Sequence, residues 1–189
     1  MNKSRLEAFS DGVIAIIITI MVLEIHAPAG MALADLKPEL PDFFSYILSF
    51  IFVAIYWNNH HHMLQASHHV NGRVLWANQF LLFWLSLVPF TTRWMGANPL
   101  APTPVALYGV VLFMAALAYY FLAQALVALH GKQSQIGMAL GKDCKGIISL
   151  IIYAAALPLA FINAWFSIAL YIAVALMWLV PDKRIEKNL

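Results

Sequence analysis

The chain has 189 residues, of which 62% are hydrophobic and 11% are charged, and its mean hydropathy is +0.78. Soluble domains average about 45–50% apolar and about 25% charged residues, so this composition indicates a polytopic membrane protein. The formal net charge is only +2 and the Lys and Arg residues are scattered, which argues against nucleic acid as a partner. A single cysteine, Cys144, excludes an intrachain disulfide.

Six apolar stretches are long enough to cross a bilayer, because about 20 helical residues span a hydrocarbon core of about 30 Å. We therefore predict an all-α integral membrane protein with one domain, residues 1–189, and no internal repeat. The predicted helices cover residues 5–26, 42–64, 72–95, 103–129, 145–163 and 165–180. The first lacks the cleavage pattern of a signal peptide and is expected to be retained. Pro89 and Pro158 each remove a backbone donor and should kink the third and fifth helices.

The first predicted helix separates its ionisable residue from an apolar stripe. At about 100° per residue, Ile16 and Leu23 share one face, with Thr19 and Ile20 near its edges. Asp11 points almost to the opposite side. Such a stripe most often faces lipid or packs against other helices, so periodicity alone does not assign it a function.

A carboxylate at the membrane threshold costs free energy unless it is paired, so Asp11 should turn toward other helices and find donors. The candidate donors at the same depth are Arg5, Trp57, Asn58, His60 and Asn78. These contacts either pin the bundle together or hold the first helix so that its stripe is aimed, and the two interpretations are compatible.

The distribution of Lys and Arg predicts that both termini are cytoplasmic. In that orientation nine of these residues lie on the cytoplasmic side and two on the other side. The nine are Lys3, Arg5, Arg73, Lys132, Lys142, Lys145, Lys183, Arg184 and Lys187, and the two are Lys37 and Arg93.

Histidines cluster around the end of the second predicted helix, as His60-His61-His62 and His68-His69. This pattern raises the alternative of a metal-dependent membrane enzyme. Adjacent helical residues point about 100° apart, so three in a row cannot all bind one ion. Membrane di-iron enzymes need a fuller set of histidines than the seven in this chain, so we expect no metal site. A secondary transporter is the other alternative, disfavoured because neither an acid pair at mid-depth nor an inverted repeat is visible.

Three motifs in chain order carry a resemblance. Arg5, Phe9, Ser10 and Asp11 form R-x-x-x-F-S-D at the start of the first helix. The second helix ends in a W-x-x-H element, Trp57 to His60, and the third holds Asn78 followed by Pro89-Phe90-Thr91. Together they resemble the signature of the transmembrane protein 175 family, potassium channels of endosomes and lysosomes with prokaryotic homologues.

The resemblance implies a homotetrameric potassium channel in which four copies of the first helix enclose the pore. The family has no TVGYG filter, and none occurs here. Its constriction is formed by side chains that correspond here to Ile16, Thr19 and Leu23, with Ile20 replacing Thr19 if the helix is rotated. The same resemblance implies that the motif residues hold the helices together near the cytoplasmic end: Arg5, Phe9, Ser10, Asp11, Trp57, His60 and Asn78.

The resemblance also implies which cofactors, partners and cellular location to expect. We expect no cofactor besides the permeant potassium ions, and no nucleic acid. The expected partners are further copies of the chain and the lipid bilayer of a prokaryotic plasma membrane.

Overall fold

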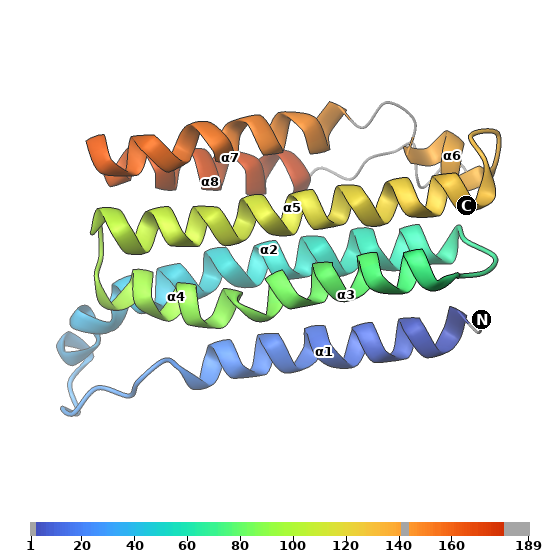
Figure 1. Ribbon diagram of the computed structural model, residues 1–189. Coiled ribbons are helices and arrows are strands. Elements are labelled where there is room, and N and C mark those ends of the chain that lie inside the picture. Colours follow the sequence, from blue (N-terminus) through green and yellow to red (C-terminus); the bar gives the residue numbers. More distant parts are fainter. Residues whose placement is uncertain (1–2, 141–143, 180–189) are drawn as a thin grey trace.

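The computed structural model describes residues 3–140 and 144–179, and every regular element in these ranges is a helix. Figure 1 shows the helices lying side by side in one bundle. They are α1 (Lys3–Leu23), the 3-10 helix η1 (Leu33–Glu39), α2 (Leu40–Gln65), α3 (Gly72–Ser86), α4 (Val88–Ala97), α5 (Pro102–His130), α6 (Gln135–Leu140), α7 (Cys144–Ile162) and α8 (Ala164–Leu179).

The predicted helices are all present, with ends that differ by three residues or fewer where the chain is described. The short helices η1 and α6 were not predicted. Among the described residues, five segments are able to cross a membrane by length and composition: residues 3–23, 33–65, 72–97, 102–130 and 144–162. Helix α8 is equally apolar but shorter, with 16 residues.

The third predicted helix is divided in two at Pro89. Helix α3 ends at Ser86 and α4 begins at Val88, because a proline lacks the N–H that would continue the helical ladder. The Thr91 hydroxyl lies 3.3 Å from the Leu87 carbonyl oxygen and 3.2 Å from that of Val88, so it satisfies backbone acceptors at the break. Pro158 acts differently, since α7 continues through it.

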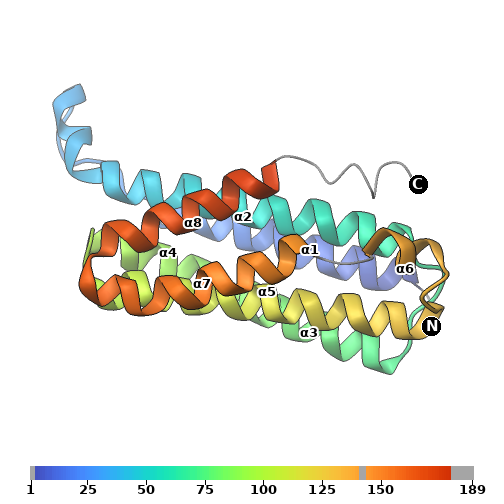
Figure 2. The ribbon, with the colours of Figure 1, turned by 90° about the horizontal axis from the view of Figure 1, so that it is seen from above.

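Helix α5 occupies the middle of the bundle and α1 lies at one edge (Figure 1). Helix α5 packs against α3, α4, α7 and α8, whereas α1 packs against α2, α3 and α4. Figure 2, turned by 90°, shows α8 lying along α2 and η1 projecting beyond the end of the bundle. One face of α1 is therefore covered by the bundle and the other is left open.

The connections alternate between the two ends of the bundle. The N-terminus and the α2–α3 loop lie at one end, and the α1–η1, α4–α5 and α7–α8 connections at the other (Figure 1). Lys37 and Arg93 thus belong to the second end, as the alternation of the predicted helices requires. Lys142, Lys183, Arg184 and Lys187 lie outside the described residues. Which end faces the cytoplasm stays a prediction.

Candidate functional site

The open face of α1 carries the residues that the stripe analysis selected. Ile16 is 58% exposed, Ile20 43% and Leu23 79%, and Thr19 is exposed as well. The opposite face is buried through Leu6, Ser10, Ile14, Ile17 and Met21, at helical spacings of three and four. In one copy of the chain, α1 therefore has an uncovered stripe, which is apolar except for Thr19.

Thr19 is the hydroxyl-bearing residue of this stripe. Its Oγ1 donates to the carbonyl oxygen of Ile16 at 2.8 Å. Because the hydroxyl hydrogen is used within the helix, the lone pairs of the oxygen stay directed away from it. An oxygen held in this way is able to contact a cation. Thr19 and Ile20 are both exposed, so the monomer does not decide which of them faces a common axis.

The amino-terminal half of α1 is held by a chain of neutral hydrogen bonds. The Asn78 side-chain nitrogen donates to Ser10 Oγ at 3.0 Å, and Ser10 Oγ donates to the Leu6 carbonyl oxygen at 2.8 Å. Asn78 Oδ1 then faces His60 Nε2 at 2.7 Å, so this nitrogen carries the proton. Ser10 and Asn78 are 0% exposed and His60 is 1% exposed. We call Ser10, His60 and Asn78 the amino-terminal anchor, which joins α1, α2 and α3.

Asp11 has a separate partner. Its Oδ1 accepts a hydrogen bond of 2.9 Å from the indole nitrogen of Trp57, and both residues are exposed. Trp57 stacks on His61, with ring centroids 5.9 Å apart. Trp57 is thus the donor that Asp11 finds in one copy, while His60 bonds Asn78 instead.

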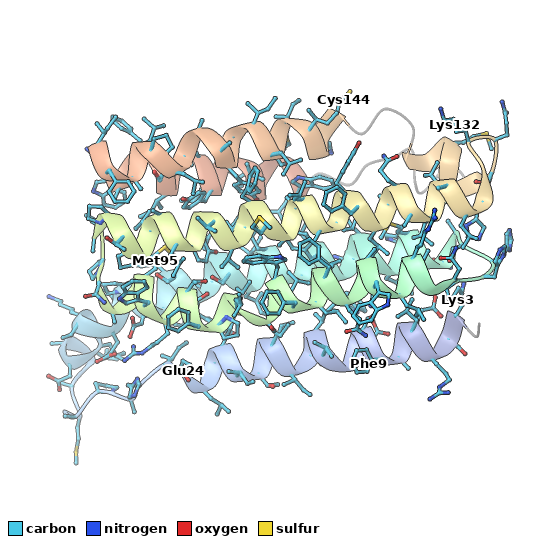
Figure 3. The ribbon with its side chains drawn as sticks, viewed as in Figure 1. Lys3, Phe9, Glu24, Met95, Lys132 and Cys144 are labelled. Atoms are coloured by element: carbon cyan, nitrogen blue, oxygen red, sulfur yellow. The ribbon has the colours of Figure 1, made fainter. Side chains whose placement is uncertain are left out.

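Two motif residues lie outside these contacts in a single copy. Phe9 is 51% exposed. Arg5 is exposed as well, and its side chain forms no hydrogen bond or ion pair with the part of the chain that the structure describes. Lys3 holds this end of α1 instead, since its ammonium donates to the Leu64 carbonyl oxygen at 3.1 Å. Figure 3 labels Phe9 on α1, with Lys3 and Glu24 at the opposite ends of that helix.

The other end of α1 is held by charged residues, of which the sequence analysis named only Arg93 and assigned it no partner. Arg93 Nη1 donates to Asp42 Oδ2, and Arg93 Nε lies 4.0 Å from Glu24 Oε2. We call Glu24, Asp42 and Arg93 the carboxy-terminal anchor, which joins α1, α2 and α4. Its signal was present in the sequence: Asp42 and Arg93 have opposite charges and lie near the same ends of adjacent predicted helices, where rare charges tend to pair.

A glycine allows this second anchor to form. A Cβ at Gly96 would lie 2.8 Å from the Cα of Asp42, closer than side chains pack. Gly96 follows Arg93 by three residues and lies on the same face of α4. The close approach of α4 to α2 at Gly96 therefore brings Arg93 within reach of Asp42.

Three buried hydroxyls add a neutral link between α2, α4 and α5. Thr92 Oγ1 lies 2.7 Å from Ser49 Oγ, and Ser49 Oγ lies 3.0 Å from the Tyr108 hydroxyl. All three residues are buried. The sequence analysis did not single them out, because isolated Ser, Thr and Tyr residues in apolar helices give no spacing signal.

His130 lies beside the backbone of His68 and His69 and is joined to it by hydrogen bonds. His130 Nε2 accepts from the backbone N–H of His68 at 3.1 Å and of His69 at 3.5 Å. His130 Nδ1 lies 3.0 Å from the Leu126 carbonyl oxygen, so both ring nitrogens are used. Within residues 3–140 and 144–179 no three His, Cys, Asp or Glu side chains are grouped as a metal site would need.

These features define a multi-pass helical membrane protein with one edge helix that is anchored at both ends. The comparisons with known proteins name its family. The profile of the endosomal/lysosomal potassium channel TMEM175 matches residues 5–89. A potassium channel of Chryseobacterium sp. (strain P1-3) is 52% identical over 189 residues, covering 100% of this chain and 98% of that one. The chain belongs to the TMEM175 family.

Two further relatives support this assignment. The crystal structure of a lysosomal potassium-selective channel TMEM175 homolog from Chamaesiphon minutus has a TM-score of 0.78 and 26% identity, covering 94% of this chain and 96% of that one. The endosomal/lysosomal proton channel TMEM175 of Danio rerio is 26% identical over 69% of this chain and 25% of its own length. Because these relatives are channels, the chain is not an enzyme, and the metal-enzyme alternative is excluded.

Proposed function

We propose that the chain is a potassium-permeable channel in which four copies enclose a pore lined by α1. The observation that carries the proposal is the uncovered stripe on α1, where Ile16 is 58% and Leu23 79% exposed while the opposite face is buried. We take potassium as the permeant ion because the Chryseobacterium and Chamaesiphon relatives are both named as potassium channels. The edge position of α1 in Figure 1 leaves this helix accessible to other copies.

In the proposed pore, rings of Ile16 and Leu23 form the constriction. Four branched apolar side chains narrow a pore and disfavour water, so an ion crossing them loses part of its hydration. The ring of Thr19 lies about 4.5 Å along the axis from Ile16, at about 1.5 Å per residue. Its oxygens would replace some of the lost water contacts. Potassium is held less tightly by water than sodium and should pass more easily, with weaker selectivity than carbonyl filters give.

The proposed assembly is one domain of residues 1–189, with α8 as its sixth span and both termini cytoplasmic. Its location is the plasma membrane of a prokaryote. Chemical cross-linking of the purified chain in detergent should yield a ladder that ends at four copies. A ladder that ends at one or two copies would contradict the four-fold pore.

Potassium flux into liposomes that contain the purified chain tests the function. Ile16→Asn should raise the flux, because a polar ring no longer excludes water. Ile151→Asn is the matched control, since Ile151 is 63% exposed and its helix, α7, lies on the opposite side of the bundle from α1 (Figure 1). Flux that is absent in the wild type, or that changes equally in both variants, would reject the pore.

Cysteine accessibility distinguishes Thr19 from Ile20. In a Cys144→Ala background, the residue that faces the pore should react with a water-soluble thiol reagent when replaced by cysteine. The residue that packs against a neighbouring copy should stay protected. Equal protection of Thr19→Cys, Ile20→Cys and Ile16→Cys would mean that this face of α1 does not meet water.

Proton conduction is a second candidate, because the Danio rerio relative is named a proton channel. A pH gradient across the liposomes, without a potassium gradient, separates the two. A membrane potential that follows the pH gradient would identify protons as the permeant ion, and one that stays at zero would exclude them.

A further inference from the structure

A long apolar groove lies between α8 and α2, and α1 contributes no residue to its lining. Its volume is about 630 Å³, and its walls come from α2, α8, η1 and the α4–α5 connection. All of its lining residues are apolar except Lys37 and Ser45. The floor is formed by buried residues, with Met95 at 4% and Ala175 at 3% exposure. A small side chain at position 175 gives the groove its depth.

The groove is long enough to hold an acyl chain. Its lining runs along α8 from Trp165 to Leu179, which corresponds to about 21 Å at about 1.5 Å per residue. One leaflet contributes about half of a hydrocarbon core of about 30 Å. The acyl chain of a lipid in one leaflet is therefore short enough to lie along the groove over its full length, with α2 on one side and α8 on the other.

A lysine that forms no ion pair within the described part of the chain lies at one end of this groove. Lys37 is exposed on η1 and lines the groove, and no carboxylate lies within ion-pair distance of it in the described part of the chain. Arg93, which lies at the same end of the bundle, is already bound to Asp42. The nearby Asp35 carboxylate accepts from the Ala32 N–H at 2.9 Å and does not line the groove.

We propose that this groove is a binding site for an anionic phospholipid from the leaflet at the Lys37 end of the bundle. One acyl chain lies between α2 and α8, and the Lys37 ammonium pairs with the phosphate. Trp165, 60% exposed at the start of α8, lies at the depth where aromatic residues border the headgroups. The site holds whether or not the chain conducts ions.

Native mass spectrometry of the purified full chain, titrated with phosphatidylglycerol or phosphatidylcholine, tests the proposal. The wild type should retain phosphatidylglycerol in preference to phosphatidylcholine. Lys37→Gln should weaken phosphatidylglycerol retention about fivefold, the size of one lysine–headgroup interaction, and remove the preference. Lys132→Gln, at the opposite end of the bundle, should have no effect.

A second variant tests the groove without changing charge. Ile172 lines the groove and is 42% exposed, so Ile172→Trp fills the site without disturbing the core. It should lower retention of both lipids, whereas Ile151→Trp on α7 should not. Equal retention of the two lipids by the wild type, or unchanged retention in Lys37→Gln, would overturn the proposal. So would loss of oligomer mass in Ile172→Trp, since a second copy of the chain would then occupy the groove.

Discussion

The two ends of α1 are held by different chemistry. At the amino-terminal anchor, Ser10, Asn78 and His60 are joined by neutral hydrogen bonds and are no more than 1% exposed. At the carboxy-terminal anchor, Glu24 reaches Arg93 only at 4.0 Å and its side chain is 49% exposed. The tight contact of Arg93 is with Asp42, which belongs to α2 and not to α1.

This difference has a mechanical consequence. Buried hydrogen bonds fix both the position and the rotation of a helix, because the groups that form them have no water to bond instead. Exposed ion pairs contribute only about 0–1 kcal/mol and are screened by salt. Helix α1 is therefore fixed near Ser10 and held loosely near Glu24. In the proposed pore, the width at Leu23 should vary more than the width at Ile16.

Replacing Asn78 should have the largest effect on stability. Asn78→Leu removes the amide, so the buried His60 Nε2 loses its acceptor and Ser10 Oγ loses its donor, while the bond from Ser10 to the Leu6 carbonyl oxygen remains. Each unpaired group costs about 1–3 kcal/mol, less where membrane helices offer other partners, so we expect a loss of about 2–4 kcal/mol. Thermal unfolding of the purified chain in detergent, followed by tryptophan fluorescence, measures it. Asn98→Leu, at an exposed asparagine, is the control, and an equal Tm for the two variants would contradict the amino-terminal anchor.

Gly96→Ala should have the next largest effect. The new Cβ would lie 2.8 Å from the Asp42 Cα, so α4 must move away from α2. Overpacking of this kind costs about 1–3 kcal/mol, and the displacement would also carry Arg93 away from Asp42. Gly72→Ala is the matched control, because nothing lies within 4 Å of a Cβ at that position. A Tm that falls equally in both variants would show that the close approach at Gly96 is not required.

Much of the fold could be predicted from the sequence because apolar runs of spanning length are a strong signal. The ends of the predicted helices agree with the structure to within three residues where the chain is described. The division at Pro89 was predicted only as a kink, since the local pattern shows that a donor is missing but not how Thr91 satisfies the carbonyls. Helices η1 and α6 are too short to produce a periodic signal.

The candidate site was predictable only where a motif or a periodicity marks it. The stripe of Ile16, Thr19, Ile20 and Leu23 follows from helical spacing, and the structure exposes it. The pairing of Asn78 with Ser10 depends on how α3 packs against α1, which spacing within one helix does not determine. Arg93 was missed for the same reason, because its partners lie 51 and 69 residues away along the chain.

Arg93→Gln should have a smaller effect than either change above. It removes the counter-charge of Asp42, whose side chain is only 12% exposed, while Arg93 itself is 33% exposed. Allowing for that exposure, we expect a loss of about 1–2 kcal/mol. Arg93→Lys should recover part of it, because one ammonium is able to reach Asp42 but not both carboxylates. A Tm of Arg93→Lys below that of Arg93→Gln would contradict the ion pair with Asp42.

Glu24→Gln should have the smallest effect and tests the comparison most directly. The Glu24–Arg93 contact is long and half exposed, so its removal should change the unfolding free energy by no more than about 0.5 kcal/mol. Any measured difference in unfolding free energy should become smaller at higher salt concentration, because the ion pair is exposed to solvent. In an Arg93→Gln background the same change should have no further effect, since the partner is gone. If Glu24→Gln instead destabilises the chain as much as Asn78→Leu, the two ends of α1 are held equally firmly. The variable width proposed at Leu23 would then lose its physical basis.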